Sequence, residues 1–138
     1  MAERSGKICL DTDIMIDYLK GKEYAKDLIE KLYLEFGKIT ITAITMYELL
    51  IGVEYMDGKD RAEVEAIIST SDILSFNKEA SRESAKVSAE LKRLGKQIGI
   101  ADVLIAGICI LSNSCLITKN IEHFRRIKNL QILGFDQL

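Results

Sequence analysis

Short apolar runs alternate with longer helix-like segments along the whole chain, and this alternation limits the possible folds more than any other feature. The apolar runs lie at residues 8–10, 39–42, 73–76, 115–118 and 130–133. Runs of this length bounded by polar residues are typical of buried strands. Strands that alternate with helices favour an α/β fold, with a parallel sheet covered by helices on both faces.

The segments between the runs carry apolar residues at helical spacing. Helices are expected at residues 14–20, 23–36, 43–55, 60–68, 78–94 and 98–111, and a short helix or turn at 120–127. The sequence contains no proline, so no helix is broken by one. The length of 138 residues suggests a single domain over residues 1–138.

Composition narrows the class of protein and its compartment. The formal net charge of −2 excludes a global basic field that would attract nucleic acid. Cys9, Cys109 and Cys115 lie in apolar runs and form no CxxC pair, which is typical of reduced core residues in a cytoplasmic protein. The longest uncharged apolar stretch, Val103 to Leu111, is far shorter than the roughly 20 residues that span a bilayer. We therefore expect a cytoplasmic protein.

The first apolar run ends in two acidic residues, Asp11 and Asp13. Open α/β sheets bind their ligands at the carboxyl ends of the strands, where Asp11 is expected. Two carboxylates this close repel each other unless a cation lies between them or one is protonated. Asp13 is a natural N-cap for the following helix, with outer-sphere contact to a metal as a second possibility. Asp17 is expected to be a solvated helix residue.

Further polar residues occupy equivalent places in the alternation. Glu48 lies in the helix after the second run, and Asp102 lies near the start of the most apolar helix. Asn120 follows the fourth run, with Thr118 two residues before it. Because parallel strands end at one edge of a sheet, we expect these side chains to converge on Asp11.

Asp102 and Glu48 each have a simpler explanation. Asp102 fits the first turn of a helix, where the helix dipole favours an acid. It equally fits a buried carboxylate that needs a partner, because its neighbours are apolar on nearly every side. Thr45-x-x-Glu48 matches a capping box, although a helix that begins after Thr42 would place Glu48 in its second turn.

The ligand types in this set favour a hard cation. Three carboxylates with oxygen-bearing partners suit Mg²⁺ or Mn²⁺, which act on phosphate oxygens. The single histidine, His123, and the absence of a cysteine cluster argue against zinc. His123 has no partner at ligand spacing and is expected to pack or hydrogen-bond locally.

Four motifs together resemble the PIN-domain family, and specifically the toxin ribonucleases of VapBC-type toxin–antitoxin pairs. They are Leu10-Asp11-Thr12-Asp13 with Ile16 and Leu19, the segment 42–52 with Tyr47-Glu48-Leu49, the segment 102–106, and the segment 116–120 with His123-Phe124. Each motif alone is weak, but their order and spacing in so short a chain are fairly specific. The resemblance covers nearly the whole chain.

The resemblance implies a three-layer α/β/α fold with a central parallel five-stranded sheet. It implies that Asp11, Glu48 and Asp102 hold Mg²⁺ or Mn²⁺, that Asn120 completes or orients the site, and that Thr118 assists. The implied reaction is hydrolysis of RNA phosphodiester bonds by metal-activated water. The implied partners are a second copy of the chain, in a homodimer, and a cognate antitoxin that blocks the site.

Two departures from the family pattern concern the site. Asp13 stands where relatives often have Asn or Ser, which adds negative charge. His123 stands where relatives often have a carboxylate, with Glu122 adjacent, so the number of metal ions is left open. RNA contact must come from local positive charge, and the Arg125-Arg126 pair is the better candidate because it lies near the predicted site.

Other functions remain open at this level. A haloacid-dehalogenase-like phosphatase would use Asp11 as nucleophile and Asp13 as acid; Lys119 could serve as its lysine, but no later acidic pair follows residues 116–118. A receiver domain needs a phospho-accepting aspartate at the end of a middle strand, and residues 75–77 offer none. A catalytically silent PIN fold could act as a module that binds RNA or a partner protein.

Overall fold

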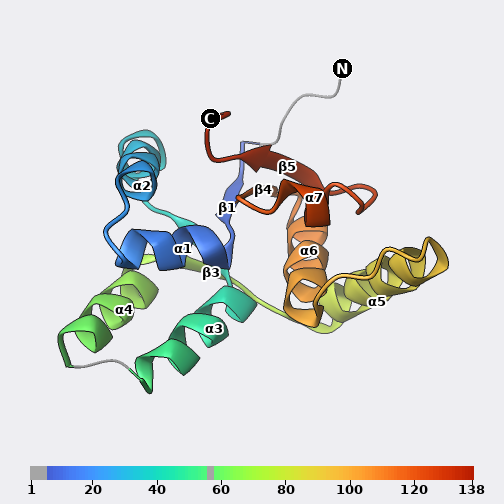
Figure 1. The fold of residues 1–138 in the computed structure, drawn as a ribbon, viewed down its shortest axis with the longest axis horizontal. Helices are drawn as coiled ribbons and strands as arrows, with labels where there is room; N and C mark the ends of the chain where they lie inside the picture. The colour runs from blue at the N-terminus through green and yellow to red at the C-terminus, as the bar shows by residue number, and fades with distance from the viewer. Residues whose placement is uncertain (1–5, 56–57) are drawn as a thin grey trace.

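The fold is described from a computed structural model, which covers residues 6–55 and 58–138. Its elements alternate as the sequence predicts (Figure 1). In chain order they are β1 (Ile8–Leu10), α1 (Thr12–Leu19), α2 (Glu23–Phe36), β2 (Thr40–Thr42), α3 (Ala43–Val53), α4 (Gly58–Thr70), β3 (Asp72–Leu74), α5 (Lys78–Arg93), α6 (Ile100–Ser112), β4 (Cys115–Thr118), α7 (Ile121–Phe124) and β5 (Gln131–Gly134).

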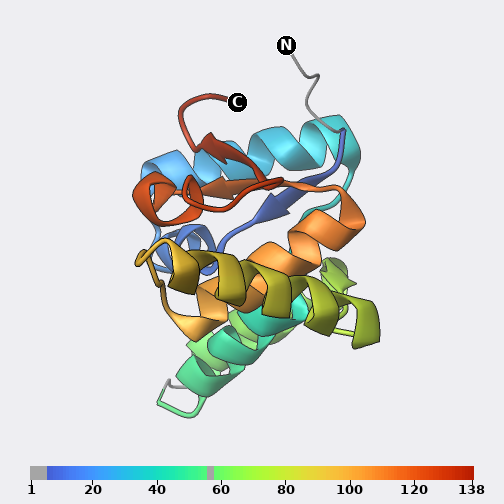
Figure 2. The ribbon, with the colours of Figure 1, turned by 90° about the vertical axis from the view of Figure 1, so that its right-hand side faces the viewer.

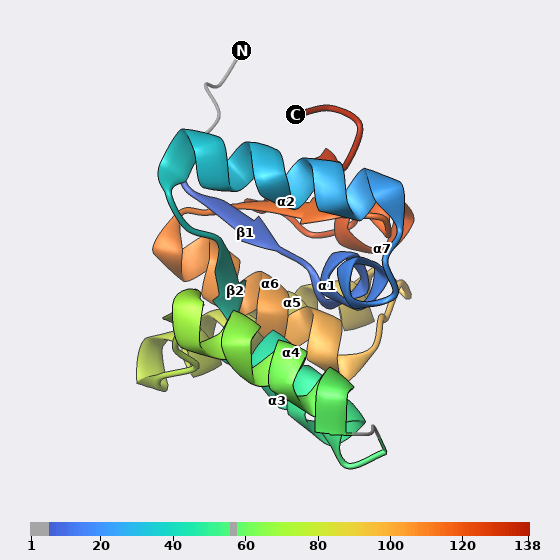
Figure 3. The same ribbon diagram turned by 90° about the vertical axis from the view of Figure 1, so that its left-hand side faces the viewer.

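All paired strands run parallel, in two hydrogen-bonded sets. One set has the order β1-β4-β5, and the other pairs β2 with β3. β2 lies beside β1 (Figure 3), which gives the overall order β3-β2-β1-β4-β5 with β1 in the middle. The five parallel strands are confirmed, but the hydrogen-bonded ladder is not continuous between β1 and β2.

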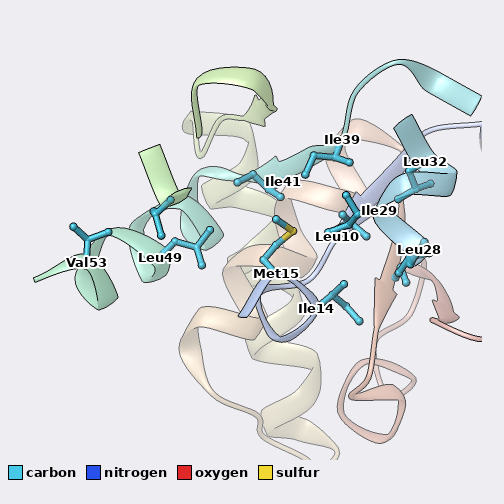
Figure 4. Close-up of a cluster of buried hydrophobic side chains, with 12 residues drawn as sticks. Leu10, Ile14, Met15, Leu28, Ile29, Leu32, Ile39, Ile41, Leu49 and Val53 are labelled. Atoms are coloured by element: carbon cyan, nitrogen blue, oxygen red, sulfur yellow. The ribbon is translucent and has the colours of Figure 1, made fainter. Parts of the chain in front are cut away.

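Helices cover both faces of the sheet, which confirms the α/β/α layers (Figure 1). Successive strand residues point to opposite faces. Leu10 packs with side chains of α1, α2, β2 and α3 on one face (Figure 4), whereas the neighbouring Cys9 packs with α5 and α6 on the other. In β4, Ile117 packs on the same face as Leu10, and Leu116 packs on the same face as Cys9. The central strands are therefore buried on both faces, which fixes where their carboxyl ends lie.

The first helix begins earlier than predicted, and Asp13 is not its cap. Asp11 is the N-cap, because its Oδ1 accepts a hydrogen bond from the Thr12 N–H at 2.9 Å. Asp13 lies in the first turn and is exposed. The chain thus turns from strand to helix within one residue, which holds the Asp11 carboxylate at the junction.

The remaining boundaries agree closely with the sequence. α2 and β4 coincide with their predicted spans, whereas α6 begins at Ile100 with Gly99 as its N-cap instead of at residue 98. β3 is shorter than predicted. The three cysteines are buried and free of disulfides, as expected. Across the described part of the chain, no helix combines the length and the apolar character needed to cross a bilayer.

Helices α5 and α6 pack closely against each other on one face of the sheet (Figure 2). Gly107 of α6 faces Ser84 of α5, and a Cβ added at Gly107 would lie 2.0 Å from Ser84 Oγ and 2.8 Å from its backbone nitrogen. Only a residue without a side chain fits at this crossing. This contact sets the position of α6, which carries Asp102 in its first turn.

Candidate functional site

Asp11 lies at the centre of the edge formed by the carboxyl ends of the strands. Its backbone N–H donates to the Ile117 carbonyl at 3.0 Å, which continues the β1–β4 pairing by one residue. Its Oδ2 accepts a hydrogen bond of 2.7 Å from Thr118 Oγ1, while Oδ1 caps α1. Only 3% of the residue is exposed. Both carboxylate oxygens are thus held in fixed directions by neighbouring donors.

Glu48 reaches this edge through three threonines whose role the sequence analysis did not predict. Thr12 Oγ1 donates to Glu48 Oε1 at 2.7 Å, and Thr45 Oγ1 lies 2.8 Å from Thr12 Oγ1. Because Thr12 uses its one proton on Glu48, Thr45 must be the donor to Thr12. Thr42 Oγ1 caps α3 by accepting from the Thr45 N–H at 3.1 Å.

This arrangement decides between the explanations of Glu48. The N-cap of α3 is Thr42, so Glu48 lies in the second turn and Thr45-x-x-Glu48 is not a capping box. The Thr45 hydroxyl instead donates to the Thr12 hydroxyl, which in turn donates to the half-buried Glu48 carboxylate. The one sequence signal for this network was the pair Thr42 and Thr45, three residues apart at a strand end, which is the spacing of a helix N-cap.

Asp102 lies in the first turn of α6, as predicted, and its side chain is 26% exposed. Its Oδ2 is 3.5 Å from His123 Nδ1, and the same ring nitrogen is 3.0 Å from Asn120 Nδ2. The Asn120 N–H donates to Thr118 Oγ1 at 2.9 Å. Asp102, His123, Asn120 and Thr118 therefore form a continuous set of contacts that ends on Asp11. The local hydrogen bond expected for His123 is present.

Burial and mutual repulsion favour the protonated forms of the two central aspartates. The pKa of Asp11 is raised to about 6, chiefly by burial and further by the negative charges of Asp102 and Asp13. The hydrogen bonds from Thr118 and Thr12 lower the pKa and offset part of this rise. Burial also raises the pKa of Asp102, with Asp13 adding to the effect and His123 opposing it. Negative charge is thus crowded at this edge beyond what the protein's own groups neutralise.

The carboxylates share an electrostatic environment without forming a closed ligand cage. Within residues 6–55 and 58–138, no three His, Cys, Asp or Glu side chains are close enough together to hold a metal ion. Glu48 is separated from Asp11 by Thr12, and its carboxylate is turned to the Thr12 hydroxyl. The donor set fits a hard divalent cation in its chemistry and charge, and binding would require side-chain rotation at Glu48.

The two arginines predicted to contact RNA differ in their surroundings. Arg125 donates to Glu122 at 2.8 Å, in an exposed ion pair three residues apart. Arg126 instead lines a groove of about 290 Å³ between α5, α6 and the segment after α7. The other charged residues that line it are Glu83, Lys86, Glu90, Arg93 and Lys128. This groove has an excess of positive charge, unlike the edge that holds the aspartates.

The expectation that Asp17 is solvated is wrong. Its side chain is only 6% exposed, with Lys22 Nζ 3.2 Å from Oδ1 and Lys119 Nζ 2.7 Å from Oδ2. The Tyr24 hydroxyl also donates to Oδ2. No pattern in the sequence indicated this cluster, because Lys119 lies 102 residues away from Asp17.

Residues 8–130 match the family described as the PIN domain. The chain belongs to the PIN-domain family. A relative from Shigella flexneri, the tRNA(fMet)-specific endonuclease VapC, is 32% identical over 91% of this chain and 95% of its own length. A protein of the same name from Salmonella typhimurium is 31% identical over 91% of this chain and 96% of its own.

Solved structures agree with these relatives. The VapBC complex of Salmonella typhimurium bound to DNA contains a chain that superposes with a TM-score of 0.84 at 30% identity, over 94% of this PIN-domain protein and 98% of that chain. A chain of VapBC2 from Rickettsia felis, bound to a DNA fragment from the promoter, superposes with a TM-score of 0.82 at 28% identity. The match covers 92% of this chain and 97% of that chain. The resemblance to VapC-type PIN domains is confirmed. Nucleases of this family generally depend on divalent metal ions.

The haloacid-dehalogenase-like alternative is not favoured for a PIN-domain protein, and the site gives a physical reason. Such a phosphatase would need Lys119 at the Asp11 carboxylate. The Lys119 ammonium is instead bound to Asp17, and Asp11 is held by Thr118 and the Thr12 N–H. Asp13, which would be the acid of that reaction, is exposed in the first turn of α1.

Proposed function

We propose that the chain, as a single nuclease domain over residues 1–138, is a Mg²⁺- or Mn²⁺-dependent endoribonuclease and the toxin of a VapBC-type toxin–antitoxin pair. The observation that carries the proposal is the crowding of Asp11, Asp13 and Asp102 at one strand edge, where burial and like charge raise the pKa of Asp11 and of Asp102. A divalent cation would make this crowding favourable. The names of the relatives, which are VapC endonucleases and ribonucleases, support the choice of RNA.

In the proposed site, Asp11, Asp102 and Glu48 hold the ion. A bound divalent cation would activate a water for attack on the phosphodiester and neutralise the charge that develops on the phosphate. Thr118 keeps Asp11 Oδ2 in place by donating to it. The Glu48 carboxylate, which accepts from the Thr12 hydroxyl, would turn toward Asp11 and Asp102 to reach the ion. Asn120, held by its N–H bond to Thr118 Oγ1, completes the set.

Substrate contact is assigned to Arg126 and, less strongly, to Arg125. Arg126 and Lys128 line the groove between α5, α6 and the segment after α7. Lys86 and Arg93 line it too, each paired with a glutamate of α5. Contacts from these side chains to phosphate would position the RNA strand without reading its sequence. Arg125 already donates to Glu122, and phosphate would compete with that carboxylate for its guanidinium.

We expect purified protein to cleave single-stranded RNA when Mg²⁺ or Mn²⁺ is present and to lose this activity in excess EDTA. The reason is that the negative charge gathered at Asp11, Asp13 and Asp102 repels a phosphate unless a divalent cation neutralises it. Cleavage is followed on a labelled RNA, with EDTA-treated protein to which Mn²⁺ is returned as the control. Activity that persists in EDTA would rule out the metal mechanism, and binding without cleavage under all conditions would favour the silent PIN fold.

The proposed toxin also pairs with a cognate antitoxin and forms a homodimer. Solved relatives are complexes named VapBC, which supports the antitoxin. The homodimer rests on the family resemblance. Light scattering at micromolar concentration should give twice the chain mass of 15.5 kDa. A mass of one chain at that concentration would count against the dimer, whatever the outcome of the cleavage assay.

A further inference from the structure

Asp17 is a buried acid that the proposed reaction does not use. It lies on α1, six residues after Asp11, which places it about 9 Å along the helix from the N-cap. Burial of an ionised carboxylate costs several kcal/mol unless partners compensate. Hydrogen bonds from Lys119 and Tyr24 hold the pKa of Asp17 well below its usual range, although burial alone would raise it. The ion pairs and the hydrogen bond thus favour the ionised form of Asp17.

One of the two lysines on Asp17 belongs to the candidate site's own loop. Lys119 stands between Thr118, whose hydroxyl donates to Asp11, and Asn120, which bonds to Thr118 and His123. Its ammonium lies 2.7 Å from Asp17 Oδ2 and 5.9 Å from the centroid of the Tyr24 ring. Tyr24 in turn packs on Phe135 after β5, with ring centroids 4.5 Å apart. The Lys119 side chain is 38% exposed, and its ammonium contacts Asp17 of α1 and the Tyr24 ring of α2.

The loop from Thr118 to Asn120 is consequently attached to α1 at two points. The first is the Thr118–Asp11 hydrogen bond at the start of the helix, and the second is the Lys119–Asp17 ion pair near its end. Thr118 is the last residue of β4 and pairs with Gly134 of β5, so the strand and the hydrogen bond to Asp11 hold the start of the loop. Beyond the strand, Lys119 ties the loop to α1. Two attachments some 9 Å apart fix its direction as well as its distance.

We propose that the Asp17–Lys119 ion pair is a positioning device for the site, which holds Thr118 and Asn120 in the geometry in which Asp11 binds the divalent cation. Lys119 then acts through its neighbours and does not itself contact the RNA. This inference rests on the proposed nuclease function only for its consequence for cleavage. Its structural part, the attachment of the loop, stands separately.

Lys22 provides a matched control. Its ammonium also pairs with Asp17, at 3.2 Å from Oδ1, but Lys22 lies at the start of α2 and has no link to the loop. Lys119→Met and Lys22→Met each remove one cation from the same buried carboxylate. A role limited to neutralising Asp17 would make the two variants alike, whereas positioning of the loop would separate them.

Three measurements test the proposal. Hydrogen exchange of the Asn120 amide, which donates to Thr118 Oγ1, should be faster in Lys119→Met than in Lys22→Met. The Mn²⁺ concentration that half-saturates the thermal shift should rise about 10-fold in Lys119→Met, the lower end of effects seen when groups that orient metal ligands are removed. Cleavage of RNA should fall by a similar factor and be restored in part by higher Mn²⁺. Lys22→Met should match the wild type in all three.

Asp17→Asn separates positioning from direct RNA contact. Asp17 is buried and cannot meet the RNA, so a loss of cleavage in Asp17→Asn equal to that in Lys119→Met supports positioning. Normal cleavage in Asp17→Asn with a loss in Lys119→Met would overturn the proposal and assign Lys119 to the RNA. Equal effects of Lys22→Met and Lys119→Met, or wild-type exchange and Mn²⁺ response in Lys119→Met, would also overturn it. Absence of cleavage in the wild type would defeat the nuclease function alone, because exchange and metal binding still report on the ion pair.

Discussion

Asp11→Asn is expected to reduce metal-dependent RNA cleavage by about 1,000-fold or more while making the metal-free protein more stable above pH 7. Loss of a ligand removes the metal's contribution to the transition state, which is several kcal/mol, and each 1.36 kcal/mol is tenfold in rate. The fold should tolerate the amide, because its oxygen can accept from the Thr12 N–H while its nitrogen faces Thr118.

The stability change follows from the direction of the pKa shift. Burial raises the pKa of Asp11 from 3.8 to about 6, so between these values the folded state binds more protons than the unfolded state. The free energy of unfolding of the wild type therefore falls as the pH rises through this window, and the loss is complete above about pH 7. A shift of this size corresponds to about 3 kcal/mol. The amide of Asp11→Asn carries no charge and would escape the loss.

Thermal unfolding in EDTA at pH 5 and pH 8 measures the effect. From pH 5 to pH 8, the Tm of the wild type should fall by about 5–10 °C more than the Tm of Asp11→Asn. Asp27→Asn, on the exposed surface of α2, gives the same chemical change without burial and should follow the wild type. Added Mn²⁺ should raise the Tm of the wild type at pH 8 and leave Asp11→Asn unaffected. A variant that is less stable than the wild type at pH 8 in EDTA would assign Asp11 a structural role instead.

The features that the sequence predicted are those set by local pattern. The run that ends at Leu10 is apolar because both faces of β1 are covered, and the acid after it marks the strand end. The position of Asp102 in a first helical turn follows from the apolar segment around it. In a parallel sheet such strand ends share one edge, so Asp11 and Thr118 could be placed together before any coordinates.

The features that the sequence missed depend on contacts between distant residues. Asp17 looked solvated because its partner Lys119 lies more than a hundred positions away, and no local pattern encodes such a pair. Asp13 was taken as the cap because it precedes an apolar run, but the strand passes directly into the helix at Asp11. The orientation of Glu48 depends on the Thr12 hydroxyl, which comes from a different helix. Side-chain direction, unlike strand order, is set by packing.

Gly107→Ala is expected to have the largest effect on stability of any single-methyl change at the described glycines. The new Cβ would lie 2.0 Å from Ser84 Oγ, 2.8 Å from the Ser84 nitrogen and 3.0 Å from its Cα. The hydroxyl can rotate away, but the backbone of α5 cannot, so the two helices must separate. Overpacking of this kind costs about 1–3 kcal/mol and occasionally more, and we expect a loss near 3 kcal/mol in chemical denaturation.

Two further variants separate the causes of that loss. Gly99→Ala makes the same change at the N-cap of α6, where nothing lies within 4 Å, and should cost far less. Ser84→Ala removes a buried hydroxyl that has no hydrogen-bond partner among the described residues, so alone it should be near neutral. Combined with Gly107→Ala it should recover only part of the loss, because the contact with the α5 backbone remains. Full recovery would show that the hydroxyl alone sets the helix spacing.

The same variant tests how the site depends on the packing of α5 against α6. Asp102 precedes Gly107 by five residues on one helix, so a shift of α6 away from α5 moves the carboxylate together with the helix. Displacement of a reacting group by about 1 Å can cost 100-fold in rate. Cleavage measured well below the Tm of Gly107→Ala should therefore fall even though no residue of the proposed site has changed. Wild-type cleavage in a fully folded Gly107→Ala would mean that the helix adjusts locally around residue 107, and that the position of Asp102 is set by its contact with His123 instead.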